Sequence, residues 1–121
     1  MAEIDVITVT FTGGQSLSPQ VDIGNKSLVG IQIPANWTTA LLSLQASIDG
    51  GATWGVVLTA AGGTATPYQV ASITGGAQCY IGIDPNILRG ISSFKIQSGV
   101  PGALTPQTNA AVLSLVTRLA L

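Results

Sequence analysis

The chain has 121 residues, long enough for one domain with a conventional core, and only 7% of them are charged, with a formal net charge of −1. An ordinary domain carries about 25% charged residues, and the four Lys and Arg residues here are scattered, which argues against a nucleic-acid partner because phosphate binding needs clustered cations. The absence of histidine excludes His-based nucleophilic catalysis and histidine metal sites.

The first predicted element is a strand over residues 4–12, where β-branched and aromatic residues dominate. Two apolar rows compete for the core side. One row holds Ile4 and Val6, and the other holds Ile7, Val9 and Phe11. Either the strand is apolar on both faces, or a bulge near Asp5–Val6 shifts the alternation.

Two further strands precede the first large loop. A short strand carries Val21 and Ile23, Gly24-Asn25 makes a turn, and residues 28–33 form the next strand. On that strand Val29, Ile31 and Ile33 share one face. Residues 34–38, PANWT, are then expected to form a loop or a short helical turn.

Residues 41–58 give the clearest local signal, a β-hairpin. Apolar residues alternate with polar ones along its first strand, namely Leu42, Leu44, Ala46 and Ile48. Asp49-Gly50-Gly51 supplies the turn, because these residues tolerate positive φ. A hairpin alone is marginal in water, so we expect a second sheet to cover its apolar face.

The next two apolar runs, residues 68–73 and 77–83, are predicted to pair as another hairpin around Gly75-Gly76. The second run aligns Cys79, Ile81 and Ile83 on one face. Cys79 is expected to pack as a small hydrophobe, because no histidine is available to activate its thiol.

Asp84-Pro85 predicts the only helical turn, since Asp caps helix N-termini and Pro suits the first helical position. Residues 91–98 return to a strand, with Phe94 and Ile96 directed inward and Lys95 and Gln97 outward. After a long loop over residues 99–109, residues 111–121 alternate and form the last strand.

These elements predict one all-β domain over residues 1–121. We expect an antiparallel β-sandwich of the jelly-roll kind, with eight or nine short strands and one short helical turn. An open barrel is the less favoured alternative. No apolar run approaches the roughly 20 residues of a membrane-spanning helix, and the N-terminus carries acids where a signal peptide carries positive charge. We therefore expect no membrane insertion. We expect the chain to be made and kept in the cytoplasm, or to leave it inside something larger.

The sequence offers little chemistry for catalysis. Each carboxylate has a structural role nearby, and Asp49-Gly50 lacks the further acidic ligands of a calcium loop. We expect no enzyme activity, cofactor or metal. Low charge instead favours a surface that faces other protein, although a merely neutral polar surface is the alternative. Trp37, Trp54 and Tyr68 are candidates for a sugar-stacking platform, with packing in the core or against loops as the alternative for each Trp.

Three segments resemble small structural proteins of tailed-bacteriophage virions: PANWTTALLSLQASIDGGATW at 34–54, DPNILRGISSFKIQSG at 84–99, and QTNAAVLSLVTRL at 107–119. The shared pattern is a Pro and Trp-Thr, a strand ending in Ser-x-Asp-Gly, an Asp-Pro turn, a Lys-x-x-Ser-Gly segment and an apolar last strand. Two departures are Ile87-Leu88, where an aromatic is common, and the low charge of the last strand.

The resemblance implies a β-sandwich virion protein, most plausibly a capsid cement or decoration protein that binds the major capsid protein or other virion subunits. It favours a homotrimer. Alternatives are a carbohydrate-binding module on the virion surface and a low-copy tail or head-completion component. Candidate protein-contact residues lie in the first strand and two loops: Ile4, Val6, Pro34, Asn36, Trp37, Thr38, Val100, Pro101 and Leu104.

Overall fold

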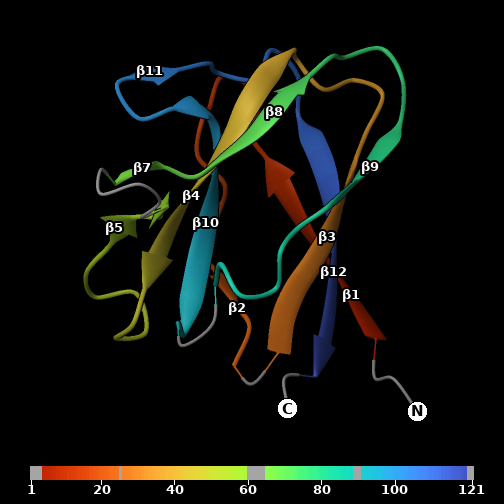
Figure 1. Cartoon of the computed structure of the whole chain (residues 1–121). Helices are drawn as coiled ribbons and strands as arrows, with labels where there is room; N and C mark the ends of the chain where they lie inside the picture. The colour runs from red at the N-terminus through yellow and green to blue at the C-terminus, as the bar shows by residue number, and fades with distance from the viewer. Residues whose placement is uncertain (1–3, 25, 60–64, 89–90, 120–121) are drawn as a thin grey trace.

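The computed structural model describes residues 4–24, 26–59, 65–88 and 91–119. Its strands form two antiparallel sheets that pack face to face, and no helix occurs in these residues (Figure 1). The predicted all-β antiparallel sandwich is confirmed. One core of buried apolar side chains lies between the sheets, and its largest members include Phe11, Phe94 and Leu115.

The first sheet has four strands in the order β1 (Ile4–Phe11), β12 (Ala111–Leu119), β3 (Lys26–Ile33) and β9 (Cys79–Gly82). β1 pairs with β12 in an unbroken register from Ile4↔Arg118 to Phe11↔Ala111. β1 therefore has no bulge near Asp5–Val6, and only one of its two apolar rows faces the core. Val9 and Phe11 are buried, whereas Ile4 and Val6 point to solvent.

A bulge occurs instead between β3 and β12, where Gly30 pairs with Val116 but Leu28 pairs with Thr117. Two residues of β3 thus lie opposite one residue of β12, and Val29 is the extra residue of this bulge. Leu28 is buried beside Ile31 and Ile33, while Val29 is only half-buried. The expected shared face of Val29 with Ile31 is wrong for this reason.

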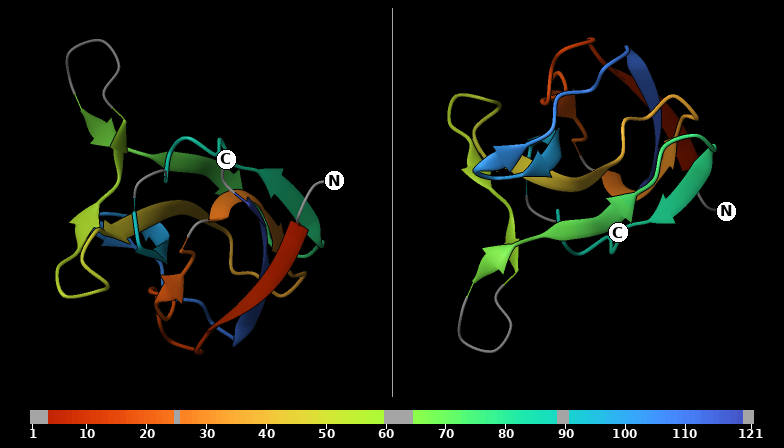
Figure 2. Two further views of the ribbon diagram at one scale, coloured as in Figure 1. Left: turned by 90° about the horizontal axis from the view of Figure 1, so that it is seen from below. Right: turned by 90° about the horizontal axis from the view of Figure 1, so that it is seen from above.

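The second sheet is centred on β10 (Ser93–Val100) and β4 (Ala40–Ser47). Short strands flank both: β2 (Val21–Asp22) and β11 (Ala103–Leu104) pair with β10, and β5 (Gly55–Val56) and β8 (Gln69–Ile73) pair with β4. β6 (Leu58–Thr59) and β7 (Thr66–Pro67) form a separate ribbon to one side of the sheets (Figure 2).

The hairpin over residues 41–58 is confirmed as β4 and β5, but its details differ from expectation. β4 ends at Ser47, so Ile48 lies in the turn and is 80% exposed. Gln97 of β10 was expected to face outward into solvent, yet it is buried. Its side-chain oxygen accepts a hydrogen bond of 3.0 Å from the Ser43 hydroxyl, so these two buried polar side chains are hydrogen-bonded to one another.

The expected hairpin between residues 68–73 and 77–83 is wrong. β8 pairs with β4 in the second sheet, and β9 pairs with β3 in the first, so the Gly75-Gly76 turn carries the chain from one sheet to the other. Two contacts hold this crossover against residues 35–39. The Gly76 N–H donates to the Ala35 carbonyl at 2.8 Å, and the Gly75 N–H donates to Thr39 Oγ1 at 3.0 Å.

The predicted helical turn is a single hydrogen-bonded turn. The Ile87 N–H donates to the Asp84 carbonyl at 3.1 Å, and the Asn86 N–H donates to Asp84 Oδ1 at 3.0 Å. The described residues contain twelve strands rather than eight or nine, because five of them have only two residues.

Candidate interaction surface

The solvent side of the four-stranded sheet forms one continuous surface, which we name the outer face. Cross-strand partners lie on the same side of a sheet, so the register defines its members. They are Ile4, Val6, Thr8 and Thr10 of β1, Val112, Ser114, Val116 and Arg118 of β12, Gly30 and Gln32 of β3, and Tyr80 of β9.

Four large hydrophobic side chains are exposed on the outer face. Ile4 is 62% exposed, Val6 61%, Tyr80 57% and Val112 50%. Between them lie the uncharged Thr, Ser and Gln side chains of the same face, and Arg118 at one end is its only charge. Apart from Arg118, the outer face is therefore uncharged and carries apolar side chains among small polar ones, which is suited to contact with another protein.

Tyr80 lies across Gly30 on the neighbouring strand. A Cβ atom built on Gly30 would be 1.8 Å from Tyr80 Oη, so the glycine leaves the space that the phenol ring occupies. Gly30 is buried although it faces outward. Tyr80 could not be identified from the sequence, because the glycine against which it packs lies fifty residues earlier, and only the β3–β9 register brings the two together.

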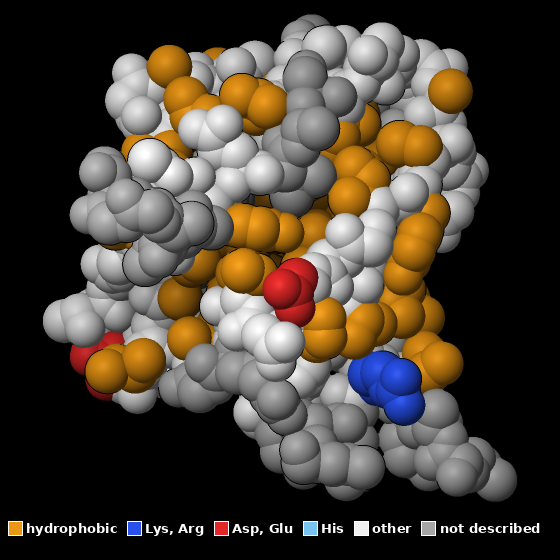
Figure 3. Space-filling view, viewed as in Figure 1, with side chains coloured by type: hydrophobic (Ala, Val, Ile, Leu, Met, Phe, Trp, Pro, Cys, Tyr) orange, Lys and Arg blue, Asp and Glu red, His pale blue; other side chains and the backbone are white. Residues whose placement is uncertain are grey.

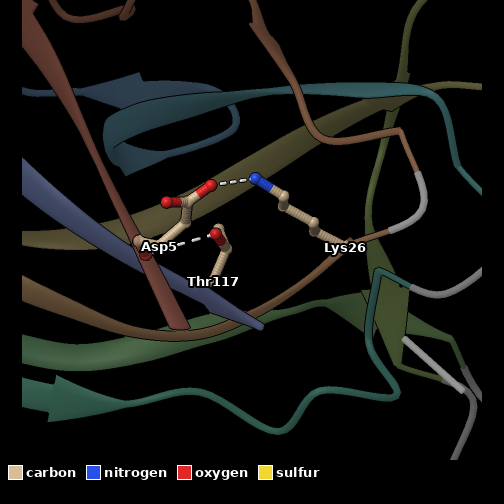
Figure 4. Close-up of polar contacts among 3 residues, drawn as sticks. All are labelled: Asp5, Lys26 and Thr117. Atoms are coloured by element: carbon tan, nitrogen blue, oxygen red, sulfur yellow. Dashed lines mark hydrogen bonds and ion pairs between the residues drawn. The ribbon is translucent and has the colours of Figure 1, made fainter. Parts of the chain in front are cut away.

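The one charge on β1 is neutralised inside its own sheet. Asp5 forms an ion pair with Lys26 of β3, and the backbone carbonyl of Asp5 accepts a hydrogen bond of 3.3 Å from Thr117 Oγ1 (Figure 4). Thr117 is fully buried and lies on β12, between the two charged residues. The cluster links three strands at one end of the sandwich and leaves no unpaired charge on β1.

Two more carboxylates are held by hydrogen bonds at turns. The hydroxyls of Ser47 and Thr53, together with the Thr53 backbone, hold the pKa of the Asp49 carboxyl well below its ordinary value. Ser93 and Gln20 donate to Asp22, and they lower the pKa of that carboxyl as well.

Of the seven charged side chains in the described residues, six are engaged within the fold. Besides those above, Asp84 accepts a backbone hydrogen bond, and Lys95 Nζ lies 4.5 Å from the centroid of the Trp54 ring. Arg118 is the seventh. Figure 3 shows one side of the molecule, where hydrophobic and uncharged polar side chains cover most of the described surface.

The candidate contact residues do not form one surface. Ile4 and Val6 lie on the outer face near the start of β1. The loop of Pro34, Asn36 and Thr38 lies at the other end of that strand, where Asn36 Nδ2 donates to the Ala110 carbonyl at 2.8 Å. The third group lies at the hairpin of β10 and β11, where Val100 and Pro101 are half-buried and Leu104 is 43% exposed.

Trp37 is not a contact residue, because its side chain is only 3% exposed. Its ring packs edge-on against Phe11, with 5.5 Å between ring centroids and 83° between the planes. The indole Nε1 is buried without a hydrogen-bond partner. The loop therefore inserts its aromatic residue into the core as an anchor.

A sugar platform of three aromatic residues is not present, because Trp37 lies inside the core. Trp54 is half-buried with Lys95 against its ring, and Tyr68 is half-buried too, with burial and the Asp84 charge raising the pKa of its phenol. Cys79, expected in the core, is half-buried and packs against it.

Within the described part of the chain, no three His, Cys, Asp or Glu side chains gather as a metal site. No helix of the described residues is long and apolar enough to cross a membrane. Comparison with protein-family models, curated proteins and solved structures found no match.

Proposed function

We propose that the protein is a non-enzymatic structural component of a bacteriophage virion, a cement or decoration protein that binds the major capsid protein or neighbouring virion subunits. The observation that carries the proposal is the outer face, where exposed Ile4, Val6, Val112 and Tyr80 stand among neutral side chains. The resemblance of three sequence segments to phage structural proteins supplies the biological setting.

The use of charge in the fold supports this proposal. Charged side chains normally keep a small protein dispersed, but here six of the seven described ones make contacts within the chain. A broad neutral face fits a partner that is present in many copies and already ordered. The protein stabilises the shell because it binds assembled subunits better than free ones, so binding shifts the assembly equilibrium.

The strand order supports the jelly-roll arrangement expected from the sequence. Eight of the strands give the order β1-β12-β3-β9 in one sheet and, through the pairings of β2 with β10 and of β8 with β4, the order β2-β10-β4-β8 in the other. Successive strands alternate between the sheets, except that β4 and β8 are neighbours in one sheet. Two four-stranded sheets with long connections between them are the pattern of paired Greek keys.

The test uses particles that lack the protein, with purified protein added back. Wild-type protein is expected to raise the temperature at which the particles release DNA, and to bind in hundreds of copies. A dozen copies or fewer would indicate the low-copy tail or head-completion component instead. Equal DNA retention with and without the protein would contradict the cement proposal.

The carbohydrate-binding alternative loses one of its three aromatic residues, because Trp37 is buried. A glycan array separates the two functions, with Trp54→Ala as the variant. The cement proposal expects no sugar-specific signal from either protein. A signal that Trp54→Ala removes would favour the alternative.

A further inference from the structure

β1 is the one long exposed strand edge in the described structure. The other strands at sheet edges, β2, β5, β8, β9 and β11, have two to five residues, whereas β1 has eight. Short edge strands are a common protection against pairing with other chains. The edge of β1 away from β12 has no strand partner among the described residues.

β1 also lacks the other common protections. Its sequence, IDVITVTF, contains no proline and no lysine, and its register with β12 has no bulge. Its one charge, Asp5, is neutralised by Lys26 of the same sheet. Among the described edge strands, β1 is therefore the long one that has no proline, no lysine and no bulge.

We propose that two copies of the protein join their β1 strands antiparallel about a two-fold axis at Ile7, which gives a continuous eight-stranded sheet. In this register Val6 lies opposite Thr8 of the second copy, and Ile4 lies opposite Thr10. The two Val6 side chains become diagonal neighbours, close enough for contact. The dimer joins two outer faces into one surface of twice the width.

A second copy fits this edge for two reasons. An antiparallel strand edge is complementary to itself under two-fold rotation, because each copy presents the same row of donors and acceptors. The antiparallel register also places Asp5 opposite Val9 of the second copy, whereas a parallel in-register pairing would stack the two carboxylates. The inference goes beyond the proposed function, and it replaces the homotrimer that the resemblance favours.

The mass of the full chain in solution tests the proposal, measured by light scattering across a concentration series. Wild type is expected at 24.4 kDa, twice the chain mass of 12.2 kDa. Thr8→Lys places a cation at the junction near its copy and is expected to weaken the dimer by about tenfold or more. Val112→Lys is the matched control on the same face, one strand away from the junction, and its dimer is expected to persist.

Cross-linking provides a second readout that does not depend on the folding of Thr8→Lys. In a Cys79→Ala background, Val6→Cys with Thr8→Cys places thiols on opposite strands at the distance of a cross-strand pair, and mild oxidation is expected to yield a covalent dimer. Cysteine at Val112 alone is expected to yield none. A wild-type monomer, a trimer, or a dimer that Val112→Lys disrupts and Thr8→Lys does not would overturn the proposal.

Discussion

The side-chain amide of Gln107 binds the backbone of Thr38 on both sides: the Thr38 N–H donates to Gln107 Oε1 at 2.7 Å, and Gln107 Nε2 donates to the Thr38 carbonyl at 3.1 Å. The Gln107 side chain is fully buried and also donates to Ser98 Oγ at 2.8 Å. Its backbone bonds to Gly14 and Gln15. This single residue joins four segments of the chain at one end of the sandwich.

Gln107→Ala is expected to destabilise the protein by roughly 3 kcal/mol, because each buried backbone group left without a partner costs about 1–3 kcal/mol. Urea denaturation measures the change. The control is Gln69→Ala, which removes the same side chain from an exposed position of β8. A loss of stability for Gln107→Ala no larger than that of the control would contradict the role of the Gln107 side chain in holding the Thr38 backbone.

Gly75→Ala tests the crossover between the sheets. A Cβ atom on Gly75 would lie 1.9 Å from the Trp37 carbonyl oxygen, and the backbone there must move to admit it. We expect a loss of about 1–3 kcal/mol from overpacking. Gly55→Ala is the matched control, because nothing lies within 4 Å of its added Cβ. Thermal unfolding of both variants gives the comparison, and equal melting temperatures would count against the crossover contact.

Two substitutions of Trp37 separate the contribution of its ring packing to stability from that of its unpaired indole N–H. Trp37→Ala is expected to cost about 3–5 kcal/mol, since it empties a core site. Trp37→Phe keeps a ring against Phe11 and removes the buried donor that has no partner, so its cost is expected to be clearly smaller. Chemical denaturation measures both, and similar losses would show that the indole itself is required.

The lowered pKa of the Asp49 carboxyl makes the stability of the fold sensitive to acid. Its folded-state pKa lies below the ordinary aspartate value of 3.8, so the unfolded chain binds a proton more readily than the folded one. The stabilisation is complete above the unfolded pKa and is lost as the pH falls through 3.8 and below. Asp22 contributes with the same sign. Asp49→Asn is therefore expected to reduce the acid dependence of the unfolding free energy between about pH 5 and pH 2.

Thr53→Val serves as the graded variant, since it removes one hydroxyl donor and leaves the Ser47 donor in place. Its acid dependence is expected to lie between those of wild type and Asp49→Asn. An unchanged acid dependence in Asp49→Asn would show that these hydrogen bonds do not set the response.

The alternation of polar and apolar residues was sufficient to predict most strands. Leu42 and Leu44 face the core as expected. The 41–58 hairpin forms as expected too, with β4 and β5 paired in one sheet. The sequence contains no comparable signal for which strands pair with one another, or for which sheet each strand joins. Sequence neighbours usually pair, yet β8 and β9 belong to different sheets, because the backbone around Gly75 packs on residues 35–39.

Polar residues were the harder part of the prediction. Ser43 and Gln97 occupy positions that the pattern assigns to solvent, but they are buried and bond to one another across β4 and β10. The outer face was predicted only in part. Ile4 and Val6 were identified as contact residues, while Tyr80 and Val112 join them through strand pairings that no local pattern encodes.

The most direct test of the central claim is co-sedimentation of the protein with empty capsid shells. The Tyr80→Lys/Val112→Lys variant places two charges on the outer face away from the β1 edge, and Ile48→Lys places one at a distant exposed apolar site. We expect wild type and Ile48→Lys to sediment with the shells and the double variant to remain in the supernatant. Undiminished binding by the double variant would contradict the claim that this neutral face holds the protein to its partner.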